Sequence, residues 1–431
     1  MKAPAHLQAQ MQAWFPADVL ARLREAGAVA AELGYSLYLI GGSIRDLLLE
    51  RDFVWDVDLV SETYGVHHLA QALQQRWGGT LQTFPRYGTA KLRLEPLELD
   101  FATARTEHYA HPGAKPDVSY SNLEEDLIRR DFTINAMAVG LQPQQFGALI
   151  DPFRGWQDLQ DRALRTLHER KFLEDPVRCW RAARMAQMLG FEIEPWTAEL
   201  IQAAMASGSF DYFFSARMRR ELDKLFDKPE PLPYLRRLHQ LEVLRCLDPR
   251  LDWPGLEARL AAVPASAGLF EAEVESVYLI LLVEALSPAG HERVLPALEL
   301  TRPQLQAWQS MHKILHIPDD WDELRPSQIY QRLEKLPPAA IWALLAAAGP
   351  ALGRAVSDFW SATRFVRPAV SGTIIKEWLP PGPHIREILQ RVLFARLDGL
   401  ITTPEQEFAL ARELADRIDQ GGQQPDRQVG E

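Results

Sequence analysis

The chain has 431 residues, 47% of them hydrophobic and 24% charged, which suits a globular protein of about two to four packed units. Its net charge of −11 argues against a protein that coats nucleic acid, although local basic patches remain compatible with an RNA partner. The N-terminal residues lack a signal-peptide pattern, the longest apolar run (277–283) is too short to span a membrane, and two cysteines cannot form a disulfide framework. We therefore expect a cytoplasmic protein without a membrane partner.

The first part of the chain, to about residue 150, predicts an α/β head. Apolar and aromatic runs bounded by Gly-Gly pairs or turns alternate with segments of helical spacing. Strands are expected at 35–40, 54–60, 90–94 and 97–101, and helices at 43–49 and 67–77. A turn at Glu95-Pro96 joins the last two strands, so we expect a small mixed sheet.

Beyond about residue 155 strand signals nearly vanish, and amphipathic patterns separated by proline-rich breaks predict helices. These helices are expected at 174–190, 217–226, 234–246, 273–287, 302–315, 339–348, 383–397 and 404–418. We divide the chain into a head (1–150), a neck (151–230), a body (231–300) and a tail (301–431). The polar residues from about 420 onward are expected to be disordered.

Asp56 and Asp58 lie two residues apart inside the apolar strand pattern at 54–60. Alternate residues of a strand point to the same face, so the two carboxylates are expected to project together. Like charges held that close repel each other, and a hard divalent cation such as Mg²⁺ is their natural counter-ion. For this motif alone, a solvated acidic pair on a surface strand is the alternative.

The segment 41–46, GGSIRD, links a strand to the start of a helix. Gly42 has no side chain, so the backbone there can approach a phosphate, and the N–H groups at the start of a helix point toward it. Arg45 can add a charge-assisted hydrogen bond to a triphosphate. A tight turn with a surface arginine explains these residues equally well by themselves. Next to an acidic pair, they favour a site for a nucleoside triphosphate and metal.

The stretch 37–60, LYLIGGSIRDLLLERDFVWDVDLV, resembles the signature of the class II tRNA nucleotidyltransferase and bacterial poly(A) polymerase family, within the DNA polymerase β superfamily. The resemblance covers about residues 35–225 and, more weakly, the C-terminal part. It implies an α+β, polymerase β-like head with a small mixed sheet, followed by an all-α neck, body and tail. It also implies two Mg²⁺ ions during catalysis, held by Asp56 and Asp58.

Further positions of this sequence match nucleotide-contacting residues of that family, namely Gly42, Arg45 and, in the motif LIRRDFTINAMA, Arg130. Asp100 is a candidate third carboxylate, although a buried capping role is the alternative. Arg129 and Arg130 can also pair with acidic residues at a helix end. In DPFRGWQDLQDRALRTL, Arg154 stands where the family usually has glycine, which leaves open whether the family's backbone conformation forms there.

The segment 172–190, FLEDPVRCWRAARMAQMLG, keeps the family's Glu-Asp-x-x-Arg element. On a helix, residues three apart form one stripe, which here contains Asp175, Arg178, Arg181 and Arg184. A surface ion-pair network is the structural alternative. The resemblance implies instead that these residues bind the nucleotide. An aspartate accepts from the exocyclic amino group of cytosine or adenine and an arginine donates to the adjacent ring nitrogen, so CTP and ATP are admitted without a template.

The implied function is addition of C, A or both to the 3′ end of tRNA, with the helical part gripping the acceptor arm by shape and phosphate contacts. Basic residues cluster at 162–184 and 217–224. A loop at 106–121 is expected to reshape the pocket between bases. Members of that family that add only CC have a shortened loop at this place. The loop of this chain is not shortened, which disfavours a CC-only enzyme and leaves an A-only enzyme open. A poly(A) polymerase and an inactive RNA-binding scaffold are the remaining alternatives.

Overall fold

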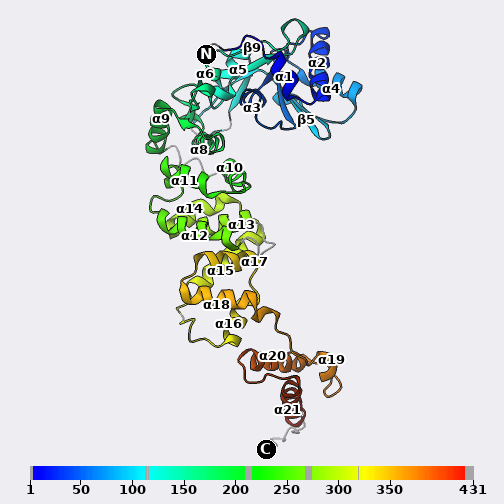
Figure 1. Ribbon diagram of the computed structural model, residues 1–431, viewed down its shortest axis with the longest axis vertical. Helices are drawn as coiled ribbons and strands as arrows, with labels where there is room; N and C mark the ends of the chain where they lie inside the picture. The colour runs from blue at the N-terminus through cyan, green and yellow to red at the C-terminus, as the bar shows by residue number, and fades with distance from the viewer. Residues whose placement is uncertain are drawn as a thin grey trace, which may run out of the picture. The chain divides into compact units, whose positions relative to one another are not determined.

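Figure 1 shows the computed structural model of the protein, which describes residues 3–111, 114, 116–208, 216–266, 274–318 and 320–422. The chain forms two compact units, Met1–Pro249 and Arg250–Glu431. The finer division into head, neck, body and tail stays a prediction. The segment predicted to be disordered lies outside the described residues from 423 onward.

The first unit is built on a mixed sheet, which confirms the expected fold class of the head. Over the described residues the strand order is β3-β4-β5-β2-β1-β8-β9, and all neighbours are antiparallel except β2 and β5. The strands are β1 (Tyr38–Ile40), β2 (Asp56–Ser61), β3 (Thr80–Phe84), β4 (Thr89–Leu94), β5 (Leu97–Thr103), β8 (Ala138–Gly140) and β9 (Leu149–Ile150).

Helices cover one face of this sheet and leave part of the other open. Val57 of β2 and Leu99 of β5 are buried in the core that contains Leu69 and Leu73, whose helix contacts β3, β4 and β5. The opposite face is covered only toward one end, where Val60 packs in a cluster with Leu123 and Leu127. The helices before α6 are α1 (Gln8–Trp14), α2 (Ala17–Glu32), α3 (Gly42–Leu48), α4 (Val66–Trp77) and α5 (Leu123–Ile128).

The predicted loop at 106–121 contains most of an antiparallel hairpin, β6 (Arg105–His108) and β7 (Asp117–Tyr120). Pro112 and Gly113 of this loop lie outside the described residues. The hairpin leads directly into α5, whose N-cap Asn122 accepts a hydrogen bond from the backbone N–H of Glu125.

Short helices complete the first unit (Figure 1), interrupted by one parallel strand pair, β10 (Ala163–Leu164) and β11 (Glu192–Ile193). They are α6 (Gly155–Gln160), α7 (Lys171–Glu174), α8 (Val177–Leu189), α9 (Pro195–Ala206), α10 (Ala216–Phe226) and α11 (Leu232–Gln240). The helix predicted at 234–246 was too long, because Glu242 adopts a left-handed conformation with φ of 59° that ends it. Arg154 also adopts φ of 63°, so this arginine takes the conformation that glycine favours.

The described part of the second unit is helical. Its helices are α12 (Trp253–Ser266), α13 (Val274–Glu284), α14 (Pro288–Leu298), α15 (Arg302–Leu315), α16 (Pro326–Leu333), α17 (Pro338–Ala347), α18 (Pro350–Ser361), α19 (Gly372–Ile375), α20 (Pro383–Leu397) and α21 (Pro404–Gly422). The apolar α17 contacts α12, α13, α15 and α18, while α19, α20 and α21 form a separate apolar cluster. In the described ranges, no helix has both the length and the apolar character needed to cross a membrane.

Candidate active site

A row of charged side chains crosses three strands on the open face of the sheet. The parallel register of β2 and β5 sets Asp58 beside Asp100 and Asp56 beside Glu98, and the antiparallel register of β4 sets Lys91 on the other side of Asp100. The Lys91 Nζ lies 2.7 Å from Glu98 Oε2, 3.1 Å from Asp100 Oδ2 and 4.0 Å from Asp56 Oδ1. Strand register therefore gathers three carboxylates around one ammonium group and sets a fourth, Asp58, beside Asp100.

Negative charge exceeds positive charge in this row, and the pKa values reflect that. Burial, with the charges of Asp56 and Asp100 added and Arg130 opposing, raises the pKa of Asp58 to about 6. Burial and Asp100 likewise raise the pKa of Asp56. A hard divalent cation binds carboxylate oxygens and neutralises the repulsion between them, so these residues fit such an ion.

The glycine turn predicted to hold phosphate borders the same carboxylates. Gly42, Ser43 and Arg45 line a cleft of about 620 Å³ together with Asp56 and Asp58. Gly41 has φ of 78°, a conformation that favours glycine, and precedes α3 as its N-cap. Arg45 is largely buried, and its guanidinium donates to Asp46 and, at 2.8 Å, to Asn135 Oδ1. The structure thus brings Gly42 and Arg45 to the acidic pair.

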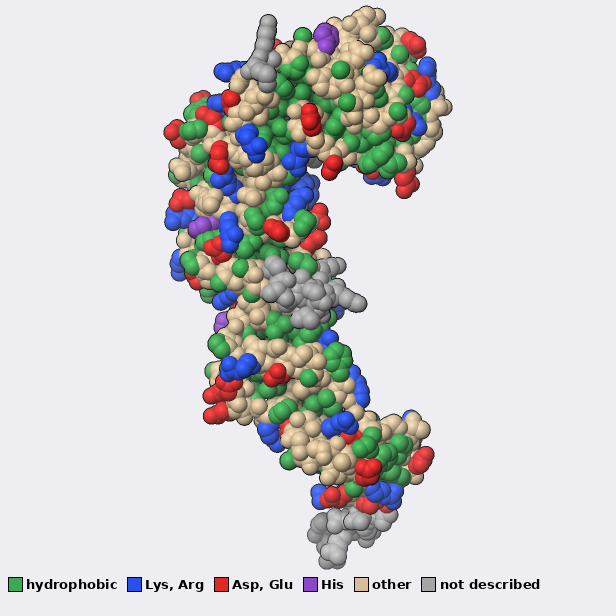
Figure 2. All heavy atoms as spheres, viewed as in Figure 1, with side chains coloured by type: hydrophobic (Ala, Val, Ile, Leu, Met, Phe, Trp, Pro, Cys, Tyr) green, Lys and Arg blue, Asp and Glu red, His purple; other side chains and the backbone are tan. Residues whose placement is uncertain are grey.

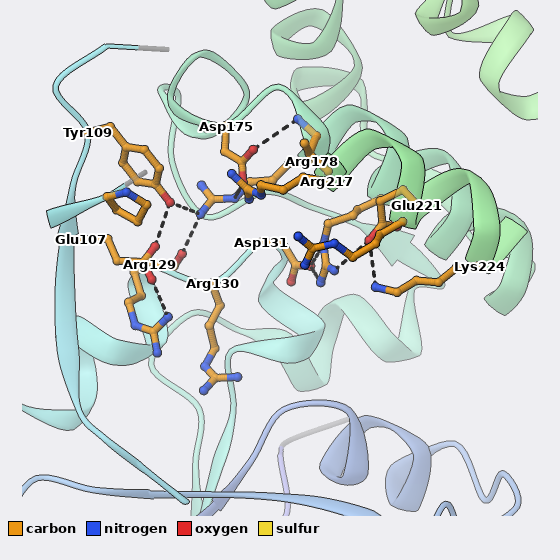
Figure 3. Close-up of a pocket in the computed structure, with 14 residues that line it drawn as sticks. Glu107, Tyr109, Arg129, Arg130, Asp131, Asp175, Arg178, Arg217, Glu221 and Lys224 are labelled. Atoms are coloured by element: carbon orange, nitrogen blue, oxygen red, sulfur yellow. Dashed lines mark hydrogen bonds and ion pairs between the residues drawn. The ribbon is translucent and has the colours of Figure 1, made fainter. Parts of the chain in front are cut away.

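A second cavity, of about 420 Å³, lies on the α8 and α10 side of the unit (Figure 3). Seven of its lining residues are basic and four are acidic, so its wall is positive although the chain is negative. Figure 2 shows Lys and Arg side chains gathered near α10, beside the hollow of this unit. The charged lining residues are Glu107, Arg129, Arg130, Asp131, Asp175, Arg178, Arg181, Arg217, Arg220, Glu221 and Lys224.

Asp175 and Arg178 face this cavity from the junction of α7 and α8. Both side chains are more than nine-tenths buried. Asp175 forms an ion pair with Arg217, and its Oδ2 lies 3.8 Å from Arg178 Nε. The Arg178 guanidinium donates to the carbonyl oxygens of Lys171 (3.4 Å) and Arg129 (3.3 Å). A buried, braced acceptor–donor pair has the rigidity that reading a base edge requires.

The next two arginines of the α8 stripe are tied to acidic side chains. Arg181 pairs with Asp131 and Glu221, and the charge of Asp131 raises the pKa of Arg181. Arg184 Nε donates to Glu221 Oε2 at 2.9 Å, and Arg184 is not among the residues that line the cavity. The structure therefore brings Asp175, Arg178 and Arg181 to the cavity but places Arg184 behind Glu221.

Glu107 and Tyr109, which sequence reasoning missed, form the opposite wall. The Tyr109 hydroxyl donates to Glu107 Oε2 at 2.8 Å and accepts from Arg178 Nη2 at 3.5 Å (Figure 3). Although burial acts to raise it, the pKa of Glu107 is lowered, chiefly by Arg129, whose Nη1 lies 3.1 Å from Glu107 Oε1. Both lie within the segment 106–121 that we expected to reshape the pocket, which is the one signal that the sequence offered.

A third cavity, of about 470 Å³, has walls in common with the two sites. It is lined by Asp58, Lys91 and Asp100 on the sheet and by Arg129 and Arg130 after α5. Both arginines also line the cavity of Asp175, and Asp58 also lines the cleft of Gly42. Arg130 Nη2 pairs with the buried Asp126 at 3.1 Å, the pairing that we considered as its structural alternative. Arg130 therefore stands between the cavity of Asp175 and the carboxylates.

Comparisons with known proteins agree with this geometry. Residues 37–165 match the family described as the poly A polymerase head domain. The A-adding tRNA nucleotidyltransferase of Geobacter sulfurreducens is 33% identical over 94% of this chain and 48% of its own length. A CCA-adding enzyme solved in an apo form matches with a TM-score of 0.82 and 28% identity, over 97% of this chain and 100% of that one. The Thermotoga maritima CCA-adding enzyme complexed with tRNA matches with a TM-score of 0.79 and 26% identity, over the same shares.

Residues 37–165 are thus similar to the poly A polymerase head domain, and the Geobacter sulfurreducens relative is named a tRNA nucleotidyltransferase. The chain as a whole has the fold of the CCA-adding enzymes. It spans about half the length of its Geobacter sulfurreducens relative. Members of this nucleotidyltransferase family generally use a divalent metal.

Proposed function

We propose that this protein adds C, A or both to the 3′ end of tRNA, using CTP and ATP and releasing pyrophosphate. The observation that supports this function best is the third cavity, which shares lining residues with both sites. Asp58 and Arg130 line one cavity, and each also lines a neighbouring one, with the glycine turn on the Asp58 side and with Asp175 on the Arg130 side. One nucleotide can therefore place its phosphates at the carboxylates and its base at α8.

Asp56 and Asp58 are the residues that would hold two Mg²⁺ ions, and Asp100 is level with Asp58 to support them. When bound, such ions polarise the phosphate, lower the charge barrier to attack by the RNA 3′-hydroxyl and stabilise the leaving pyrophosphate. Gly42 and Arg45 orient the triphosphate beside these carboxylates. The side chains of the protein therefore position the reactants and need not form a covalent intermediate with them.

Base selection is assigned to Asp175 and Arg178. An acceptor beside a donor pairs with the amino group and ring nitrogen of cytosine or adenine, whereas uracil and guanine present the reverse order. Both side chains are buried in a pocket wall and braced by the chain, so they choose the base without a template strand. Arg181 extends the same wall, and a nucleotide contact by Arg184 requires it to reach past Glu221.

A-only addition is the second candidate, because the Geobacter sulfurreducens relative that matches nearly the whole chain is named an A-adding enzyme. The present chain has the hairpin β6–β7 in contact with Arg178 through Tyr109, which agrees with a switch between bases in a chain that adds both. The tRNA acceptor arm is the proposed partner and the cytoplasm the proposed location.

Extension of three tRNA transcripts tests the proposal. One transcript ends before CCA, one after the first C and one after CC, and each is offered every nucleotide singly. Ordered use of CTP and then ATP supports full CCA addition, and use of ATP on the CC end alone supports the A-only candidate. A long A tract on unrelated RNA would identify a poly(A) polymerase, and no extension of any transcript would leave an RNA-binding scaffold.

A further inference from the structure

Three side chains able to bind a metal ion meet in the second unit. Glu284 is the last residue of α13, and His312 lies in the last turn of α15. His316 is the residue that caps the C-terminal end of α15. The two histidines are four residues apart, so they share one side of the helix, as metal-binding histidine pairs on helices do.

The potential ligand atoms of these residues are already close together. One ligand atom from each of the three side chains lies within 4.8 Å of the other two. His312 Nδ1 is 3.0 Å and 3.2 Å from the two oxygens of Glu284, and His316 Nδ1 is 3.9 Å from Glu284 Oε1. Tetrahedral bonds of about 2.0–2.1 Å to zinc separate ligand atoms by roughly 3.3 Å. His316 Nδ1 also lies 2.8 Å from the carbonyl oxygen of His312, so the ring of His316 gives up that contact when this nitrogen binds an ion. Rotations of the two imidazole rings then bring the three groups to a bonding arrangement.

The carboxylate of Glu284 is buried and is held by hydrogen bonds from Trp308 and His312. Its side chain is only 5% exposed, and it accepts a hydrogen bond from Trp308 Nε1 at 3.0 Å. Within the described ranges, the basic groups that reach ion-pair distance of it are His312 and His316, with no arginine or lysine. A metal ion held by Glu284 and both histidines would supply the permanent positive charge that these hydrogen-bonded groups lack, and so would stabilise the fold.

The three side chains are packed against other residues on one side and open to solvent on the other. His291 Nε2 lies 2.8 Å from the carbonyl oxygen of Val283, and the ring of His291 packs edge-on against Trp308 at 5.1 Å. The ring of Trp308 in turn lies 5.6 Å from that of His312. His291 and Trp308 thus brace the ligand set from one side. On the other side the histidines are open, with side-chain exposures of 43% for His312 and 61% for His316, so an ion can enter from solvent.

We propose that Glu284, His312 and His316 bind one divalent cation of the zinc type, with solvent in the fourth position. Two imidazoles and one carboxylate suit borderline ions such as Zn²⁺, whereas Mg²⁺ prefers oxygen ligands. The ion joins the end of α13 to the end of α15 and so fastens the two helices together. This site belongs to the second unit and uses none of the residues assigned to nucleotide addition.

Binding of Zn²⁺ to the full chain in excess Mg²⁺ tests the site, with bound metal measured by equilibrium dialysis and Co²⁺ absorption reporting the coordination number. The Asp58→Asn variant accompanies the wild type to discount metal at the carboxylate row. We expect one tightly bound equivalent in both, and visible Co²⁺ bands typical of four ligands. His316→Ala, at an exposed position, and Glu284→Gln, which keeps the side-chain shape, should each weaken binding by about a hundredfold or more.

His384→Ala is the matched control, because His384 is a partly exposed histidine of the same unit whose ring nitrogen contacts the carbonyl of Pro380. It should bind Zn²⁺ as the wild type does, and all variants should keep their far-ultraviolet circular dichroism. An equivalent that persists in both His316→Ala and Glu284→Gln would overturn the site. So would the loss of the equivalent in Asp58→Asn alone, or the absence of tight Zn²⁺ binding by the wild type.

Discussion

Replacing Asp58 by asparagine should stabilise the metal-free protein and abolish its activity. The pKa of Asp58 is raised from 3.8 to about 6, so folding favours its protonated form. The stabilising contribution of that proton is complete below the ordinary pKa and is lost as the pH rises through about 6. Above pH 6 the ionised carboxylate therefore costs the folded state up to about 3 kcal/mol, at 1.36 kcal/mol for each pKa unit. Asparagine has the same shape and no charge.

Denaturant unfolding with a metal chelator measures this effect. At pH 8 the Asp58→Asn variant should exceed the wild type by about 1–3 kcal/mol, and the difference should shrink as the pH falls from 6 toward 4. Asp52→Asn is the control, because Asp52 lines the same cleft but is exposed. Added Mg²⁺ should stabilise the wild type and not Asp58→Asn. A variant that is less stable than the wild type at pH 8, or a difference that does not vary with pH, would refute this reasoning.

Three further changes probe the same site. Asp56→Ala should lower the rate of nucleotide addition about a thousandfold or more while tRNA binding persists, as measured by single-turnover extension and filter binding. Lys91→Met should lower the Mg²⁺ concentration needed for half-maximal activity, because the ammonium group no longer competes for the carboxylates; an unchanged or higher requirement would argue that Lys91 does not face the ion. Shortening 106–121 should impair A addition far more than C addition if the chain adds both, whereas equal losses would remove the hairpin from base switching.

The sequence predicted the parts of the site whose geometry is local. Asp56 and Asp58 face one side because a strand repeats every two residues, and Arg178 and Arg181 share one side of α8 because helical residues three apart lie together. The helix predicted at 174–190 was wrong at its start, because the backbone leaves the helical conformation at Asp175 between α7 and α8. The helix predicted at 302–315 has the observed bounds, because the Thr301 capping box and a proline in the first turn mark its start. Residues whose positions depend on pairing between segments were harder to predict from one sequence.

Lys91 and Tyr109 show why. Lys91 reaches the carboxylates through the register of β4 against β5, and register is set by the turn and the buried face rather than by the residue itself. Tyr109 reaches Arg178 because a hairpin folds where we expected a loop. The helix at 234–246 was overextended for another reason, since the left-handed conformation of Glu242 carries no signal in a residue of ordinary helix propensity.

The most direct test of the central claim is the nucleotide preference of Arg178→Ala and Asp175→Ala. The value of kcat/KM is measured for all four nucleoside triphosphates on a tRNA ending before CCA and on one ending after CC, with folding checked by thermal melting. We predict that both variants lose discrimination by about 1–3 kcal/mol, so that UTP and GTP gain relative to CTP and ATP. If all four values fall together and the order of preference is unchanged, Asp175 and Arg178 are structural and the base is chosen elsewhere.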